Sequence, residues 1–170
     1  MRKLRRWVEF LSWGAVVVGS LVAWWDLTEA HKQHRLDEAK RVYREVDERY
    51  CDFLKLALDH PTLDCFSNPL DGGHYMPTGE VQKAEQALLF TYLSDVFEVA
   101  FVSYQKHQER EQIQEIKELN ADQWSGWENY IKKFLARDTY RTNWYQIRSE
   151  YDAKFIAYMD GLCRTNGYMK

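Results

Sequence analysis

The chain has 170 residues, of which 45% are hydrophobic and 15% aromatic, and this composition excludes the low-hydrophobicity, high-charge class of disordered proteins. Residues 1–25 carry four basic groups and one acidic group, which leaves 19 basic and 25 acidic groups for the rest. An acidic domain lacks the electrostatic footprint that nucleic-acid phosphates require, so we expect no nucleic-acid binding. Three cysteines are too few for a disulfide framework, although a bridge between Cys51 and Cys65 stays open if the domain faces an oxidising compartment.

A basic tail followed by an apolar stretch predicts a single transmembrane helix within residues 1–27. Two serines are the only polar side chains between Phe10 and Trp25. With its flanks the stretch reaches the roughly 20 residues that a helix needs to cross a bilayer. A signal peptide is the alternative, but bulky Leu21 and Trp24 around the candidate cleavage site at Ala23 favour an uncleaved anchor. The residues expected at the membrane interface are Arg2, Lys3, Arg5, Arg6, Trp7, Trp24 and Trp25.

Residues 28–170 are expected to form a helical domain that the membrane helix enters without a break, because no Gly or Pro occurs between Leu21 and His60. Apolar residues in this stretch recur at alternating steps of three and four, which is typical of a helix that packs along one seam. The seam consists of Leu36, Ala39, Tyr43, Val46, Tyr50, Phe53 and Ala57. Its aromatic residues favour a bundle core over the alternative, a parallel homo-oligomeric coiled coil.

All three prolines and three of the glycines fall between His60 and Glu80, which predicts one long loop over residues 60–80. Long loops in compact domains are often functional, so this loop is a candidate binding surface. Its polar candidates are Asp59, His60, Asp64 and His74. Their spacing matches no known metal-binding motif, and we predict no metal site.

Three further helices are expected, from Glu80 to Leu119, from Asp122, and from Asp138 to Leu162, which gives an antiparallel bundle of about four helices. No segment shows the alternation of a half-buried strand. The middle of the first of these helices, residues 87–104, is apolar nearly all round, but Asp95 and Glu98 at its centre favour a buried bundle helix over a second membrane span. The fold class is therefore all-α.

Two features of these helices are candidates for ligand binding. Glu98, one turn from Asp95 on an apolar helix, could be a buried binding carboxylate; the alternative is a structural pair with Arg137, Arg141 or Arg148. Trp124 and Trp127, with Tyr130, could stack a ring-bearing ligand; the alternative is core packing. No serine elbow, phosphate-binding loop or dinucleotide fingerprint occurs, so neither an enzyme nor a cofactor is indicated.

The run VYREVDERYCDFLKLALDHPTLDCF, the helix QWSGWENYIKKF and the segment FIAYMDGL resemble a family of small bacterial proteins without an assigned activity. The resemblance covers most of the chain from Val42 onward, and it implies a single N-terminal membrane helix with a helical domain in the bacterial inner membrane. It carries over no catalytic residue. Four basic residues in the tail against three beyond the span favour an extracytoplasmic domain, whereas unbridged cysteines favour a cytoplasmic one.

The sequence thus predicts a membrane-anchored interaction or scaffold module, in contact with membrane lipids, whose loop at residues 60–80 docks a protein partner or a second copy of the chain. The alternative is a ligand-responsive sensor or effector, in which ligand binding to the bundle controls the association of transmembrane helices. The alternative requires a small-molecule pocket near Glu98 and the Trp124 helix.

Overall fold

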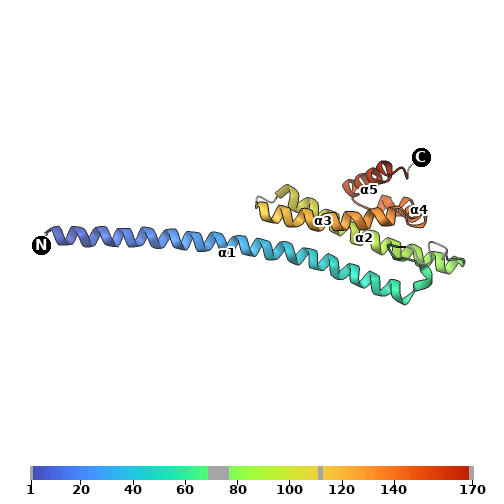
Figure 1. Ribbon diagram of the computed structural model, residues 1–170, viewed down its shortest axis with the longest axis horizontal. Coiled ribbons are helices and arrows are strands. Elements are labelled where there is room, and N and C mark those ends of the chain that lie inside the picture. The colour runs from blue at the N-terminus through green and yellow to red at the C-terminus, as the bar shows by residue number, and fades with distance from the viewer. Residues whose placement is uncertain (1, 69–76, 111–112, 169–170) are drawn as a thin grey trace. The chain divides into compact units, whose positions relative to one another are not determined.

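Every element of the computed structural model is helical within the described backbone, which covers residues 2–68, 77–110 and 113–168 (Figure 1). The described side chains begin at residue 20 and omit residues 21, 107, 109 and 110 as well. The all-α fold class is confirmed. The elements are α1 (Arg2–Asp59), η1 (Pro61–Leu63), α2 (Glu80–Arg110), α3 (Gln114–Leu135), α4 (Asp138–Ile147), η3 (Arg148–Glu150) and α5 (Ala153–Thr165).

The chain divides into two compact units, residues 1–40 and residues 41–170. The first unit is a single helical segment, the N-terminal part of α1. The second unit holds the remainder of α1 and all the other elements. The absence of Gly and Pro between Leu21 and His60 predicted an unbroken helix in this region, and α1 is unbroken from Arg2 to Asp59.

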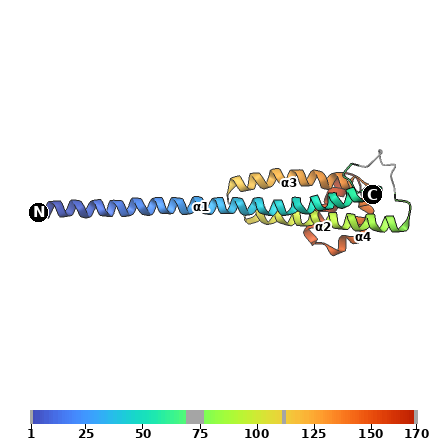
Figure 2. The ribbon, with the colours of Figure 1, turned by 90° about the horizontal axis from the view of Figure 1, so that it is seen from below.

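The second unit is a bundle built around α2, which packs against η1, α3, α4 and α5. Figure 2 shows α2 and α3 running beside the part of α1 that belongs to this unit. The predicted seam of α1 faces this core, since Tyr43, Val46, Phe53 and Ala57 are buried. The bundle prediction for this part of the seam is confirmed. From α2 the core takes Phe90, Leu93, Val96, Phe97, Ala100 and Phe101.

Among the described residues, one helical stretch, Glu80–Lys106, is long and apolar enough to cross a membrane by length and composition. Its apolar side chains nevertheless supply much of the core of the second unit, and Ser94 within it is fully buried against Tyr140. The stretch is therefore the central bundle helix of this fold, as the sequence predicted. The membrane span predicted within residues 1–27 falls largely on side chains outside the described set.

Helix boundaries differ from the prediction in two places. The second predicted helix ends at Arg110 and the next begins at Gln114, so Asp122 lies inside α3 and is not its N-cap. Ile113 separates the two helices, because its extended backbone, at φ −83° and ψ 115°, cannot belong to a continuous helix, and Ile116 in the first turn of α3 is fully buried. The predicted helix from Asp138 to Leu162 is also wrong, since it consists of α4, η3 and α5.

Contacts from α2 explain the break between α4 and α5. The backbone N–H of Asp152 donates to Glu98 Oε1 at 2.7 Å, and the Tyr151 hydroxyl donates to Asp95 Oδ1 at 2.8 Å. Asp152 in turn caps α5 by accepting from the Lys154 N–H at 2.8 Å. The described chain therefore has five α-helices, and the bundle of about four helices was an underestimate.

Replacement of Phe97 tests whether α2 lies at the centre of the bundle. Its ring is fully buried and lies 5.9 Å from the ring of Phe134 and 6.2 Å from that of Trp127, measured between centroids. We expect Phe97→Ala to lower the free energy of unfolding by about 3–5 kcal/mol, because it leaves a cavity. Urea unfolding of the full chain in detergent, followed by tryptophan fluorescence, measures this change.

The control for Phe97→Ala is Leu88→Ala on the same helix, since Leu88 is 70% exposed. This change is expected to alter stability by no more than about 0.5 kcal/mol. Equal effects of the two substitutions would contradict the placement of α2 at the centre of the bundle.

Candidate functional site

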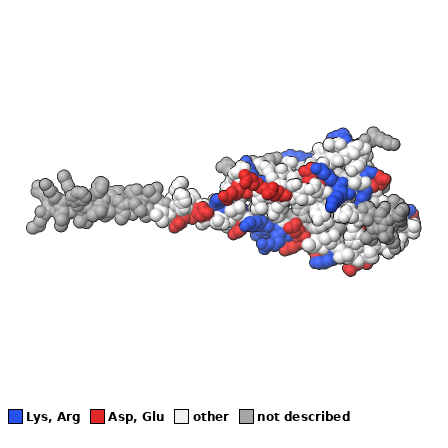
Figure 3. Space-filling model, in the orientation of Figure 1, with Lys and Arg blue, Asp and Glu red and all other residues white. Residues whose placement is uncertain are grey.

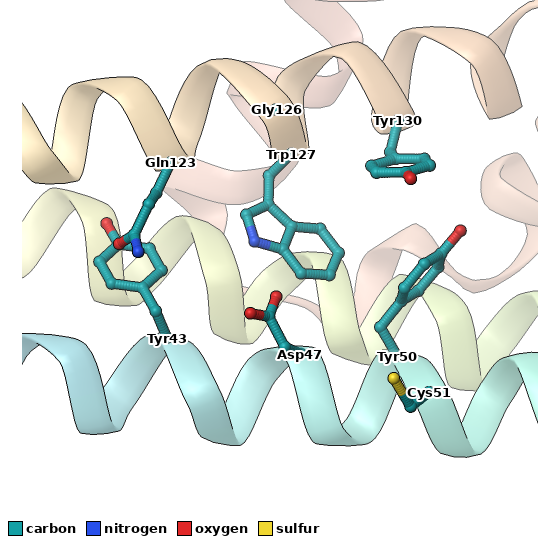
Figure 4. A pocket seen from close by; sticks show the side chains of 8 residues that line it. All are labelled: Tyr43, Asp47, Tyr50, Cys51, Gln123, Gly126, Trp127 and Tyr130. Carbon is teal, nitrogen blue, oxygen red and sulfur yellow. The ribbon is translucent and has the colours of Figure 1, made fainter.

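A groove of about 450 Å³ opens between α1 and α3 within the second unit (Figure 4). Helix α1 forms one wall of the groove, and helix α3 forms the opposite wall. Eight residues line the groove: Tyr43, Asp47, Tyr50 and Cys51 from α1, and Gln123, Gly126, Trp127 and Tyr130 from α3. Most of the exposed lining is apolar.

Helical spacing places these residues on facing surfaces. The other lining residues of α1 come four, seven and eight positions after Tyr43, and those of α3 come three, four and seven positions after Gln123. At this spacing each set lies on one side of its helix. Gly126 opens the groove, because a Cβ atom there would meet no atom within 4 Å. The groove thus results from large rings beside one residue that has no side chain.

Three rings form the aromatic part of the groove. The ring centroid of Tyr50 lies 5.4 Å from that of Trp127, edge to face at 83°, and 5.2 Å from that of Tyr130. Trp127 and Tyr130 lie 6.1 Å apart. Behind them the Phe97 ring supports Trp127 from the core at 6.2 Å. Contacts of this geometry hold rings in fixed orientations, so the walls are preformed for a flat apolar group.

The groove also contains polar atoms without partners. Tyr43 Oη and Gln123 Oε1 are buried, and no described group lies within hydrogen-bonding distance of either. Leaving a buried polar atom unpaired typically costs about 1–3 kcal/mol. Both oxygens can accept a hydrogen bond from a bound molecule, and the Tyr43 hydroxyl can also donate one.

Asp47 supplies the only carboxylate among the lining residues. In Figure 4 it lies between the Tyr43 and Gln123 end of the groove and the Tyr50 and Tyr130 end, and its carboxylate points towards α3. Asp47 is an exposed residue, and partial desolvation raises the pKa of its carboxyl group because it disfavours the charged form. Within the described part of the chain no cation or hydrogen-bond donor offsets this cost.

The cysteines differ in accessibility, and all three are free thiols. Cys51 is exposed at the groove, whereas Cys65 and Cys163 are buried. Burial raises the pKa of Cys65 to about 12 and also raises that of Cys163. Cys51 is thus a natural chemical reporter for the groove.

The predicted tryptophan pair is divided between the groove and the core. Trp127 lines the groove with Tyr130, but Trp124 faces inward, where its ring stacks on Tyr104 at 4.8 Å and contacts Phe101 at 5.8 Å. For Trp124 the core-packing interpretation is the one that the contacts support. Trp127 serves both purposes, since it is 6% exposed and contacts core and groove residues.

Glu98 and Asp95 shape the turn that precedes α5 and do not line the groove. Glu98 is half-buried and Asp95 exposed. The proposed ion pairs with the later arginines are wrong for both carboxylates. Those arginines pair elsewhere: Arg137 with Asp64, Arg141 with Asp138 and Arg148 with Asp160.

The first part of the predicted loop is folded into the bundle. Asp64, at a left-handed φ of 49°, is buried, and its carboxylate accepts from Arg137 at 2.7 Å. Arg137 also donates to the backbone oxygens of Asp64 and Phe66, each at 2.5 Å. Gln86 of α2 donates to the Leu63 carbonyl at 2.5 Å. Asp64 therefore has a structural role, as one half of a buried ion pair.

The other loop candidates do not join Asp64 in a site. Asp59 and His60 are exposed at the end of α1, and His74 lies outside the described residues. Among the side chains that the structure describes, no three His, Cys, Asp or Glu groups are close enough to share a metal ion. On the face shown in Figure 3, acidic and basic side chains are interspersed over the bundle, so charge alone marks no binding surface there.

Six groove residues were not among the binding candidates from the sequence: Tyr43, Asp47, Tyr50, Cys51, Gln123 and Gly126. Tyr43 and Tyr50 were assigned to the seam alone. Two signals could have pointed to the groove, namely the carboxylate of Asp47 between two seam tyrosines and the lone glycine next to Trp127. Neither signal shows that the two helices face each other at these positions.

Fold and site define an all-α bundle with a preformed aromatic groove between two of its helices. No family model, curated protein or solved structure matches the chain. The resemblance to small bacterial membrane proteins stays a prediction.

Thiol labelling tests the accessibility of the three cysteines. We expect iodoacetamide to alkylate Cys51 in the folded full chain, while Cys65 and Cys163 react only after unfolding, because burial hides both thiols. Peptide mass spectrometry of native and urea-unfolded samples measures the three sites. Equal labelling of Cys51 and Cys65 in the native protein would contradict the burial of the loop.

Replacement of Arg137 tests whether its buried ion pair with Asp64 stabilises the fold. The side chains of Arg137 and Asp64 are 9% and 3% exposed, and Arg137→Ala leaves the Asp64 carboxylate buried without its cation. We expect a loss of about 3–5 kcal/mol in the free energy of unfolding. Lys132→Ala, which breaks the solvent-exposed pair with Glu128, is the control and should cost at most about 1 kcal/mol. Similar losses in both variants would show that the pair with Asp64 is not important for stability.

Proposed function

We propose that the protein is a membrane-anchored helical binding module whose groove between α1 and α3 takes a small ligand with a flat apolar body. The observation that carries the proposal is the combination of preformed aromatic walls with buried, unpaired polar atoms at Tyr43 and Gln123. Asn120 and Tyr158 also carry buried polar atoms without partners, but neither residue lines the groove, so the combination with open aromatic walls is what singles out Tyr43 and Gln123.

The size and lining of the groove support a small ligand. Its volume of about 450 Å³ falls in the usual range for ligand sites, which is roughly 300–1,000 Å³. Such sites are lined mainly by apolar and aromatic side chains, with a few polar groups that fix orientation. The aromatic rings and the three polar side chains of Tyr43, Asp47 and Gln123 fit this description.

The groove is a better supported binding surface than the loop at residues 60–80. In the described parts of that loop, Leu63, Asp64, Cys65 and Pro77 are buried and hence not available to a partner, whereas residues 60–62, 68 and 78–80 are exposed. Docking of a protein partner or a second copy of the chain at the loop, the first prediction from the sequence, has no comparable observation behind it.

The anchor is part of the proposal, with membrane lipids as its partners. The described apolar side chains at the end of the predicted span are exposed: Trp24 is 64% exposed, Trp25 is 69% exposed and Leu27 is 69% exposed. Contiguous exposed apolar residues are typical of a surface that contacts a membrane or another protein. Tryptophans followed by polar residues fit the headgroup level of a bilayer, and the four basic residues of the tail would lie on the other side.

One helix links anchoring and binding in this proposal. The same α1 that carries the predicted membrane span supplies four groove residues, and a ligand in the groove would touch both α1 and α3. Ligand occupancy would thereby stabilise the attachment of α1 to the bundle. This is the simplest physical basis for a ligand-responsive effector.

Membrane association gives one test. We expect the full chain to stay in the membrane fraction after an alkaline carbonate wash, and Val17→Arg combined with Val18→Arg to release it. Each arginine at the centre of a span costs about 2.5–3.5 kcal/mol on insertion scales. Release of the unchanged chain by the wash would contradict the anchor.

Protection of Cys51 gives the test of the groove. With indole as an uncharged probe, we expect alkylation of Cys51 to slow in the full chain. Gly126→Leu fills the open space in the groove and should abolish the protection. Gly161→Leu is the matched control, because Gly161 is also a helical glycine whose Cβ would meet no atom within 4 Å, but it lies on α5 outside the groove.

The comparison is made within each variant, as the ratio of alkylation rates with and without indole, so that shielding by the new leucine itself cancels. Protection in the original chain and in Gly161→Leu, but not in Gly126→Leu, is the expected pattern. Equal protection in all three proteins, or protection in none, would overturn a ligand site in the groove.

A further inference from the structure

We infer that the ligand of the groove is a protonated organic amine, whose apolar body packs against Tyr50, Trp127 and Tyr130 and whose ammonium group binds the carboxylate of Asp47. The inference rests on the proposed function, because it names the chemical class that the same groove selects. It follows from the charge, the ring faces and the unpaired polar atoms of the lining.

The charge of the lining favours a cation. Asp47 is its only acidic residue with a carboxylate, and no Lys, Arg or His is among the eight lining residues. Asp47 makes no ion pair or hydrogen bond within the part of the chain that the structure describes, while neighbouring acidic residues of α1 such as Glu45 and Asp52 pair with Arg49 and Lys55. An ammonium group would give Asp47 the counter-charge that the fold does not supply, and a bound anion would face repulsion.

The aromatic walls favour the same charge. The face of an aromatic ring carries negative potential and attracts cations, most strongly where water is excluded. The Tyr130 ring already shows this attraction, since the ammonium of Lys133, which is not among the lining residues, lies 5.8 Å from its centroid. The rings of Tyr50 and Trp127 are also available, since no Lys or Arg in the described part of the chain makes a cation–π contact with either.

The unpaired polar atoms favour an amine that retains N–H bonds. Gln123 Oε1 can only accept a hydrogen bond, and the Tyr43 hydroxyl can accept one as well as donate. A protonated primary or secondary amine carries two or three N–H donors, enough to serve Asp47 and one of these oxygens together. A quaternary ammonium ion lacks such donors and would leave Gln123 Oε1 unpaired. The lining therefore favours a primary or secondary amine with an aromatic or similarly flat body.

Three compounds test the inference: phenethylamine, phenethyl alcohol and phenylacetate. Each has a phenyl ring on a two-carbon unit, and their end groups are positive, neutral and negative. Isothermal titration of the full chain at pH 7 in one detergent is expected to give affinities in the order amine, alcohol, acid. We expect the amine to bind more tightly than the alcohol, because only the amine brings a positive charge to the Asp47 carboxylate. In Asp47→Asn the preference for the amine over the alcohol should disappear.

The alcohol also reports whether each variant is folded and whether the groove binds at all. Gly126→Leu should lose all three compounds, and Gly161→Leu should lose none. Binding of the alcohol as tight as that of the amine, or an amine preference that survives in Asp47→Asn, would overturn the inference and leave the ligand site standing. Failure of all three compounds to bind, or equal binding in Gly126→Leu, would overturn the proposed ligand site itself.

Discussion

The second unit depends on large aromatic rings that separate α1 from α3. Tyr50 meets Trp127 edge to face at 5.4 Å, and Phe53 meets Phe134 in the same manner at 6.3 Å. Rings of this size keep two helices further apart than aliphatic side chains would. Towards α2 the space between the helices is filled by the core, but on the outer side it stays open beside Gly126. The groove is thus a direct consequence of the packing that holds α1 in the bundle.

This arrangement places stability and binding on the same residues. Trp127 contacts Phe97 in the core and also forms a wall of the groove, and Tyr43 has its ring in the core while its hydroxyl is unpaired. Buried polar groups elsewhere in the bundle are of two kinds: Asn120 and the Tyr158 hydroxyl are also without partners among the described groups, whereas others are paired within the fold. Asp64 is held by Arg137, and Ser94 shares a hydrogen bond of 2.8 Å with Tyr140. The unpaired atoms of Tyr43 and Gln123 differ from those of Asn120 and Tyr158 because they belong to residues that line an open groove with aromatic walls, which is why we assign binding to this place.

Much of the fold follows from local sequence signals, whereas the site depends on contacts between distant segments. The seam of α1, the buried α2 and the start of α4 at Asp138 were predictable, because helical periodicity and turn residues are local. The break before α5 was not, since it depends on Glu98 accepting from Asp152, 54 positions along the chain. The groove was missed for a similar reason. Periodicity placed Tyr50 and Trp127 on apolar faces, but only the register between α1 and α3 brings them together.

The most direct test of the central claim, that the groove is a ligand site, is to follow the indole N–H of Trp127 by NMR. The full chain has seven tryptophans, and a Trp127→Phe variant identifies the signal of interest. The account predicts that the Trp127 signal shifts with saturation as phenethylamine is added, while the signal of Trp144, buried away from the groove, does not move. A Trp127 signal that stays in place, or a uniform drift of all the indole signals, would contradict it.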